Sequence, residues 1–194
     1  VAIDTIELNR IPMVNPMKLN VGFVSTRFAG IDGVSMESSK WARVFEDEGH
    51  ACFWFAGELS KSEHISLQAR QANFKDDQNQ WINDQLFGTH KKSLRLARII
   101  CNYKSTIASR LKLFIDMYRL DLLVVENALA IPMHIPLGLA LADVIAETGI
   151  PTIAHHHDFY WERDRYLPLN GSKIYIHRAF PPRLPNIEHV VINS

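Results

Sequence analysis

LNVGFVSTRFAGIDGVSMESSKWARVFEDEGHACFWFAG, residues 19–57, indicates the class of fold. Its first eight residues are a mostly apolar run that leads into a glycine-bearing loop, which is typical of a buried parallel strand. Core-type side chains then recur at helical spacing from Val34 to Phe45, and Gly49 suits a left-handed cap after the helix. The apolar run 51–57 predicts a second strand. Together these pieces predict one βαβ unit.

Strands and helices continue to alternate along the rest of the chain. Apolar runs predict further strands at residues 121–127, 150–156 and 189–194. Periodic patterns predict a long amphipathic helix over 90–118 and another helix over 136–149. The polar segment 58–89 is weakly patterned, so we expect an irregular excursion with a short helix near Asp84. This order predicts an α/β, Rossmann-like domain whose doubly wound, mostly parallel sheet carries helices on both faces.

The composition fits a soluble globular protein. A chain of 194 residues is long enough for one domain with a full core, and its formal net charge of zero provides no overall field for nucleic acid. Cys52 and Cys101 lie in apolar segments without metal-ligand spacing, so we expect two buried thiols in a reducing, cytoplasmic setting. We expect residues 1–17 to be an N-terminal extension and 18–194 to be the domain.

Three polar clusters follow predicted strands. They are the loop from Gly30 to Gly33, the pair Glu126 and Asn127, and the run 155–158. In open parallel sheets, ligands bind beyond the carboxyl ends of the strands, so the three clusters predict one site.

Each cluster also has a purely structural interpretation. Glycines at 30 and 33 would let a ligand phosphate approach the helix start, or they would simply form a turn, since the loop lacks both the dinucleotide and the P-loop pattern. Glu126 and Asn127 would bind sugar hydroxyls or act in proton transfer, or they would brace the loop. We expect His134 to be structural.

The segment TIAHHHDFYWER, residues 152–163, carries the most chemistry. Alternation along a strand puts His155 and His157 on one face and His156 on the other. Two histidines beside Asp158 could begin a metal site, but no complete metal motif is present, and we expect no metal. The alternative is a histidine that contacts a substrate, with Asp158 fixing its tautomer or its loop. The aromatic residues that follow would form walls, and Arg163 would bind an anion.

The long helix is strongly basic between residues 91 and 112. Its basic residues are Lys91, Lys92, Arg95, Arg98, Lys104, Arg110 and Lys112, and no acidic residue follows until Asp116. This pattern favours a solvated helix face. The other interpretation is a surface that attracts anionic lipid headgroups, and thus a peripheral membrane contact, or an acidic acceptor.

Taken together, these motifs resemble a known family. Residues 21–58 and the segment 150–163 are similar to parts of the N-terminal domain of the large retaining glycosyltransferase family with the two-domain B-type fold (group 1, family 4-like). The family's glycine loop matches Gly33-Val34, with Asp32 in place of its first glycine. Its G-H-E-V sequence corresponds to residues 49–52, where Ala51-Cys52 replaces Glu-Val.

The resemblance implies a function and a set of roles. The chain would be the acceptor-side half of an enzyme that transfers a sugar from a nucleotide-sugar donor, with retention, to an unknown small-molecule, glycan or lipid acceptor, without a metal or other cofactor. His157 and Asp158 would be the catalytic pair. Gly30, Gly33, Val34 and Arg163 would lie on the donor-phosphate side, and Glu126 and Asn127 would bind the acceptor.

The family's donor-binding residues have no counterpart in this sequence. We therefore expect that the C-terminal donor domain is absent from this chain, and that the chain alone does not transfer sugar, because basic residues of that domain would stabilise the leaving diphosphate. Two other functions stay open. One is a non-catalytic binding module on the same fold, and the other is a metal-dependent hydrolase that uses His155, His157 and Asp158.

Overall fold

The fold is given by a computed structural model, which describes residues 17–88, 93–167 and 171–192. Within these residues six strands form one sheet in the order β5-β3-β1-β6-β7-β8, and every neighbouring pair is parallel. The strands are β1 (Asn20–Val24), β3 (Ala51–Ala56), β5 (Ser66–Gln68), β6 (Leu122–Glu126), β7 (Thr152–His156) and β8 (Ile187–Val191). The two-residue strands β2 (Arg27–Phe28) and β4 (Glu58–Leu59) pair separately.

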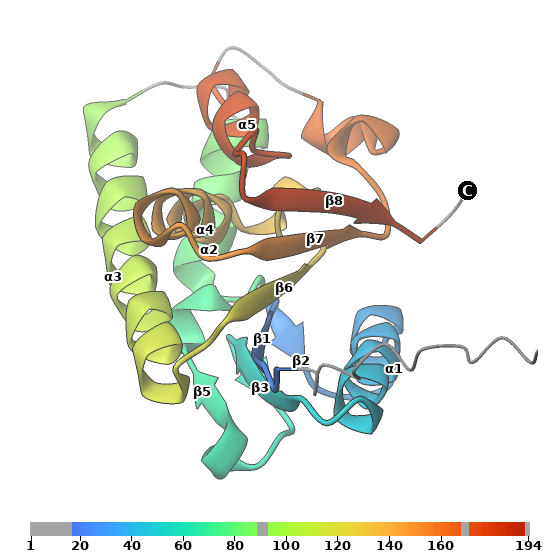
Figure 1. Ribbon diagram of the computed structural model, residues 1–194. Coiled ribbons are helices and arrows are strands. Elements are labelled where there is room, and N and C mark those ends of the chain that lie inside the picture. Colours follow the sequence, from blue (N-terminus) through green and yellow to red (C-terminus); the bar gives the residue numbers. More distant parts are fainter. Residues whose placement is uncertain (1–16, 89–92, 168–170, 193–194) are drawn as a thin grey trace, which may run out of the picture.

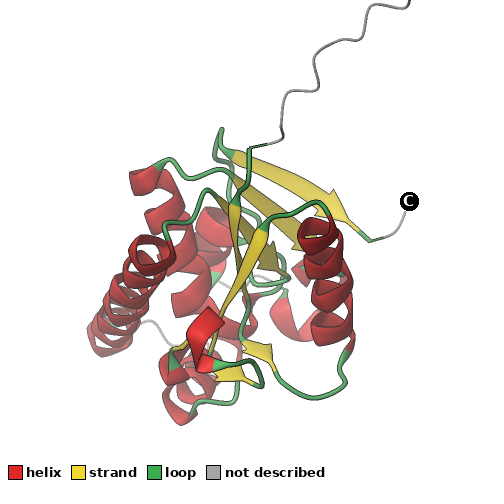
Figure 2. Ribbon diagram, turned by 60° about the horizontal axis from the view of Figure 1, so that its bottom comes forward, coloured by secondary structure: helices red, strands yellow, loops and turns green. Residues whose placement is uncertain are grey.

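Helices cover both faces of the sheet (Figures 1 and 2). The α-helices are α1 (Gly33–Asp47), α2 (Asp77–Asn83), α3 (Leu94–Tyr118), α4 (Ile135–Thr148) and α5 (Lys173–Ala179). The segment Asp84–Gly88 is π-helical, and short 3-10 turns span Glu63–Ile65, Arg70–Ala72, Pro132–His134, Tyr160–Glu162 and Asp164–Tyr166. The predicted α/β, Rossmann-like fold with a parallel sheet is thus confirmed.

Alternation along the strands divides the core into two layers. On one face, α1 packs over Phe23, Trp54 and Val124, and the rings of Phe23 and Trp54 stack with centroids 4.7 Å apart. On the other face, α3 and α4 pack over a larger cluster that includes Phe55 and Leu123. Because successive strand residues point to opposite faces, one short apolar run supplies both layers.

The chain reverses its direction of travel across the sheet next to β1. From β1 it moves outward to β3 and β5, then it crosses back to β6 and continues through β7 to β8. The carboxyl ends of β1 and β6 therefore lie side by side where the order reverses, and such a switch point leaves a crevice between the loops. The fold itself thus favours a ligand site above β1, β6 and β7.

Several predicted elements differ in detail from the structure. The segment 58–89 contains the expected short helix, α2, which continues into the π-helical segment. It also contains β5, a strand of the six-stranded sheet that was not predicted. The helix α5 was not predicted. The predicted start of the long helix at His90 lies outside the described residues, and so do Lys91 and Lys92.

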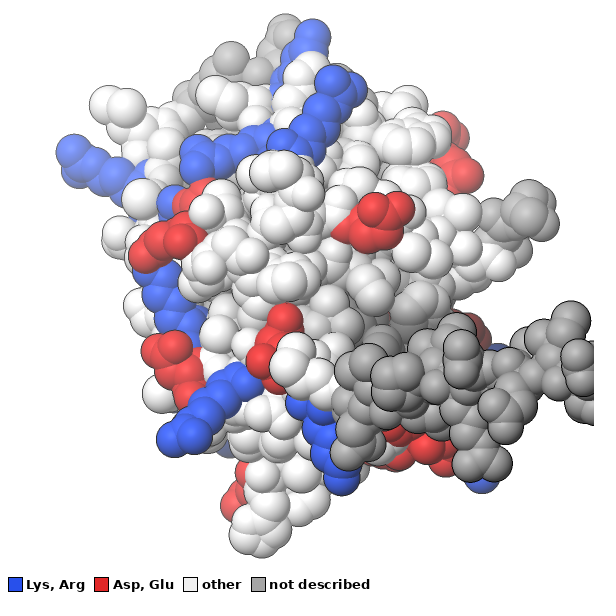
Figure 3. Space-filling view, in the orientation of Figure 1, with Lys and Arg blue, Asp and Glu red and all other residues white. Residues whose placement is uncertain are grey.

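Two of the basic residues of α3 pair with acidic side chains of α4. The Nζ atom of Lys104 lies 2.6 Å from Oδ2 of Asp143, and Nζ of Lys112 lies 2.6 Å from Oε1 of Glu147. On the face shown in Figure 3, basic and acidic side chains alternate along the edge over α3. None of the helices in the described part of the chain combines the length and the apolar character needed to span a bilayer. The peripheral membrane contact stays a prediction.

The prediction of two buried thiols is wrong for one of them. Cys52 is buried under α1, whereas Cys101 is exposed on α3. The apolar stripe of α3 includes Ile100, and the next residue is rotated by roughly 100° about the helix axis, out of the core. Burial, with a smaller contribution from Glu46, raises the pKa of Cys52 to about 12.

The thiolate is the reactive form of cysteine, so the buried Cys52, whose pKa is raised, should react much more slowly than the exposed Cys101. One thiol per chain is expected to react with a maleimide at pH 7 in the native protein, and two in guanidinium chloride. Mass spectrometry of the labelled chain counts them. The variant Cys101→Ser should leave no reactive thiol in the native state, and equally fast labelling of both cysteines would contradict the described packing.

Candidate functional site

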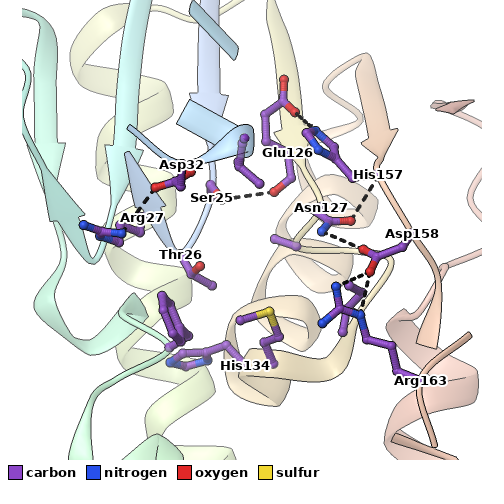
Figure 4. A pocket seen from close by; sticks show the side chains of 16 residues that line it. Ser25, Thr26, Arg27, Asp32, Glu126, Asn127, His134, His157, Asp158 and Arg163 are labelled. Carbon is purple, nitrogen blue, oxygen red and sulfur yellow. Dashed lines mark hydrogen bonds and ion pairs between the residues drawn. The ribbon is translucent and has the colours of Figure 1, made fainter. Parts of the chain in front are cut away.

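A cavity of about 430 Å³ opens at the switch point, between the loops that follow β1, β6 and β7 (Figure 4). It is lined by Ser25, Thr26, Arg27, Asp32, Gly33, Val34, Phe74, Glu126, Asn127, Ala128, Ile131, Met133, His134, His157, Asp158 and Arg163. The lining combines apolar walls with a few charged and polar groups. Such a combination is typical of a small-molecule site.

Glu126 and two histidines form a buried cluster on one wall of the cavity. The register of β6 and β7 puts Glu126 beside His155, and alternation brings His157 to the same face. The Oε2 atom of Glu126 lies 2.9 Å from Nδ1 of His155 and 3.3 Å from Nε2 of His157. Burial alone would raise the pKa of Glu126, but the hydrogen bonds from both rings outweigh it and hold this pKa below its usual value. The carboxylate is therefore charged at neutral pH.

A second set of contacts fixes the loop after β7. The Asn127 side-chain amide donates to Asp158 Oδ1 at 3.2 Å, and the backbone N–H of His157 donates to Asn127 Oδ1 at 3.3 Å. The guanidinium of Arg163 pairs with the other oxygen of Asp158. Asn127 itself has a φ of 58°, a left-handed conformation that asparagine tolerates better than most residues. These contacts order the His157–Asp158 loop, as the loop-bracing interpretation expected.

The opposite wall is formed by the segment after β1 and by the start of α1. The hydroxyl of Ser25 donates to the backbone carbonyl of Glu126 at 3.0 Å, which ties the two strand ends together. Arg27 pairs with Asp32 at 3.3 Å and with Glu58 at 3.2 Å. Asp32 also caps α1, because its Oδ1 accepts from the N–H of Ser35 at 2.9 Å. An arginine and a helix N-terminus thus lie on one side of the cavity.

His134 caps the N-terminus of α4 and also borders the cavity. Its Nδ1 accepts a hydrogen bond from the N–H of Leu137 at 3.1 Å, and its Nε2 lies 2.7 Å from the carbonyl oxygen of Gln71. These two contacts require the neutral ring with its hydrogen on Nε2. Burial lowers the pKa of His134 to about 4, so this form predominates at neutral pH. The structural role that the sequence predicted for His134 agrees with these contacts.

The structure brings seven of the eight predicted site residues to this cavity: Gly33, Val34, Glu126, Asn127, His157, Asp158 and Arg163. Gly30 does not line it. Gly30 has a φ of 83° and faces Arg27, which fits a turn. At Gly33, by contrast, an added Cβ would meet nothing within 4 Å, so the glycine leaves open space.

Two features of the site differ from the sequence prediction. Phe159 and Trp161 do not line the cavity; they stack on each other at 4.3 Å. Ser25, Thr26 and Arg27 line it although the sequence prediction did not name them. Their position directly after the first strand is a signal that could have identified them.

The Glu126 cluster is also the group of described residues best placed to hold a metal ion. One ligand atom each from Glu126, His155 and His157 lie within 4.8 Å of one another. Glu126 therefore takes the third position that the hydrolase interpretation gave to Asp158. Oε2 of Glu126 already accepts hydrogen bonds from both rings without an ion, while Oε1 has no partner among the described residues.

Fold and cavity define a Rossmann-like α/β domain with a polar ligand pocket at its switch point. The chain is similar to two mannosylglucosylglycerate synthases, which are glycosyltransferases. It is 30% identical to that of Thermotoga maritima over 178 residues, and 30% identical to that of Petrotoga mobilis over 185 residues. Each match covers 91% of this chain and 40% of the relative, so the chain spans about two-fifths of the length of these curated relatives. No protein-family model and no solved structure matches the chain.

Proposed function

We propose that this chain forms the acceptor-side domain of a retaining glycosyltransferase that uses a nucleotide-sugar donor. One observation carries the proposal: the His157–Asp158 loop and the Gly33-Val34 start of α1 border the same cavity at the switch point. These are the residues on which the resemblance to the B-type family rests. The similarity to two glycosyltransferases over nine-tenths of the chain supports the same conclusion.

The geometry supports a distribution of roles within the cavity. His157 contacts the donor sugar, and Asp158 and Arg163 hold its loop. The open space at Gly33 and the start of α1 suit a phosphate group, because helix N–H groups attract anions. Asn127 holds the loop from the acceptor side. Glu126 is buried against two histidines, so it acts through His157, which contacts the donor sugar, more readily than by direct contact with a substrate.

The relatives' name suggests the class of acceptor. Mannosylglucosylglycerate contains sugar hydroxyls and the carboxylate of glycerate. A site for such a molecule needs hydroxyl acceptors and at least one cation, and guanidinium groups bind carboxylates in a bidentate manner. Arg27 and Arg163 place guanidinium groups on the two walls of the cavity, where each is also paired with a carboxylate of the protein. We therefore propose a small sugar acid as acceptor and an activated mannose as donor.

A transfer assay tests this proposal. The protein, at the length at which its source cells make it, is incubated with nucleotide-activated mannose and glucosylglycerate, and the product is identified by mass spectrometry and by the configuration at its anomeric carbon. We expect a mannosylated product with retained configuration, and none from the 194-residue chain alone, since a donor domain has to stabilise the leaving diphosphate. Transfer by the 194 residues alone would refute the two-domain requirement. Binding without turnover at either length would favour a binding module instead.

A further inference from the structure

The rings of His155, on β7, and of His157, which follows that strand, share the carboxylate of Glu126. Both rings face Oε2, and no described residue donates to Oε1. The Glu126 side chain is fully buried, His155 is 2% exposed and His157 is 15% exposed. A buried carboxylate needs hydrogen-bond donors, and in the described part of the chain these two rings provide them.

This contact determines where each ring carries its hydrogen. An ionised carboxylate only accepts hydrogen bonds, so the nitrogen facing it must be an N–H. His155 therefore carries hydrogen on Nδ1, and His157 carries it on Nε2. A neutral imidazole has one N–H, so Nδ1 of His157 is left with a free lone pair. Within the described residues Nδ1 of His157 has no partner, and His157 borders the cavity.

The surroundings restrict the orientation of the two rings. The ring of His155 lies against Trp41 with centroids 4.6 Å apart, and against His157 with centroids 5.0 Å apart. The backbone of His157 is held by Asn127, and the carbonyl of Glu126 is held by Ser25. The polar atoms are thus oriented before any ligand arrives, which is the condition for a selective hydrogen bond.

We propose that Glu126 and His155 are positioning residues that set Nδ1 of His157 as a hydrogen-bond acceptor facing the cavity, where it receives a hydrogen bond from a sugar hydroxyl. The identity of the ligand group rests on the proposed function. The assignment of the two tautomers rests on the hydrogen-bond geometry alone. The site would then select a sugar that carries a hydroxyl at this point and discriminate against its deoxy analogue.

The tautomers can be measured directly by NMR. The 194-residue chain is labelled with ¹⁵N-histidine, and long-range ¹H–¹⁵N correlation spectra are recorded at pH 7.5. We expect opposite tautomers, with His155 protonated at Nδ1 and His157 at Nε2. In Glu126→Leu, the acceptor that both rings share is removed, so both rings are expected to lose these fixed tautomers. A wild-type spectrum with His157 protonated at Nδ1 would overturn the proposal, even if the variant failed to fold.

Zinc distinguishes the proposal from a metal site. One equivalent of ZnCl₂ should leave the ring nitrogens of His155 and His157 unchanged if Glu126 is their permanent partner. A stoichiometric shift of both rings would show that the cluster is a metal site, and the positioning role would be abandoned.

The functional consequence is measured in the active protein. Among nucleotide-activated monodeoxy sugars, one is expected to lose about 10- to 100-fold in kcat/KM, since it lacks the hydroxyl that Nδ1 accepts. Glu126→Leu should reduce this discrimination and change the pH profile of kcat/KM, which a merely structural role would not do. Equal turnover of all deoxy donors would overturn the ligand assignment. If no donor is transferred at all, the proposed function fails while the NMR result still decides the tautomers.

Discussion

Acidification from pH 7 to pH 5 is expected to lower the free energy of unfolding by about 4 kcal/mol, because two buried histidines are neutral in the fold. His134 has both ring nitrogens engaged, one as acceptor for Leu137 and the other facing the carbonyl of Gln71. A proton on Nδ1 would face the N–H of Leu137 and remove the cap of α4. Burial lowers the pKa of His134 to about 4.

His156, on the other face of β7, is the second buried histidine whose protonation is expected to lower the free energy of unfolding. Its Nε2 lies 2.8 Å from Nδ1 of His189 on β8, whose Nε2 is 3.1 Å from the carbonyl oxygen of Pro182. This chain of contacts leaves Nδ1 of His156 buried without a partner among the described residues. Burial, followed by the neighbouring histidines, lowers the pKa of His156 to about 4. A proton on Nδ1 would have no acceptor.

The pH window follows from these two values. Between about 6.5 and 4 the unfolded chain binds protons that the folded chain does not, so stability falls as the pH falls through this range. Each group contributes about 1.4 kcal/mol per pH unit, or about 2 kcal/mol at pH 5. Glu126 and Asp143 have lowered pKa values, so their contributions are lost only at lower pH. Urea unfolding at half-unit pH steps measures the slope.

A matched variant isolates His134. In His134→Asn the side-chain oxygen can still cap α4, and nothing at this position titrates. In this variant the decrease in the free energy of unfolding between pH 7 and pH 5 should be about half that of the wild type. His64→Asn, at an exposed position, should leave the slope unchanged. A wild-type loss below about 1 kcal/mol would show that the two rings are not held neutral.

The main strands of the fold could be predicted because they are long and apolar. The predicted strands at 121–127 and 150–156 match β6 and β7, since both are buried on both faces. β5 could not be predicted, because in its three residues only Leu67 is buried and no alternation is visible. β2 and β4 have two residues each, which is too short for any periodic signal.

The location of the site was predictable, but its contacts were not. The strand ends that carry Asn127 and His157 meet at the cavity, because carboxyl ends of neighbouring parallel strands share one edge. The contact between Glu126 and His155 depends on the register of β6 and β7, which the sequence alone does not contain. The pairing of Arg27 with Glu58 likewise depends on the small β2–β4 sheet.

His157→Ala is expected to lower kcat of the complete enzyme about 100-fold, since the substitution removes the polar group proposed to contact the donor sugar. The fold should survive, because His157 is only one of two donors to Glu126 and is partly exposed. Loss of its hydrogen bond to the buried carboxylate is expected to cost about 1 kcal/mol of stability. Thermal unfolding of the same preparation separates this cost from the loss of activity.

The contrast with an exposed histidine outside the cavity makes the result interpretable. His64→Ala removes an exposed histidine outside the cavity, so kcat should stay within about twofold of the wild type. In His157→Ala, a fall in kcat without a matching rise in KM indicates an interaction that is made mainly in the transition state. A rise in KM with kcat unchanged would mean that His157 only binds the substrate. Activity within threefold of the wild type would remove His157 from the reaction altogether, and the loop after β7 would then serve only to close the cavity.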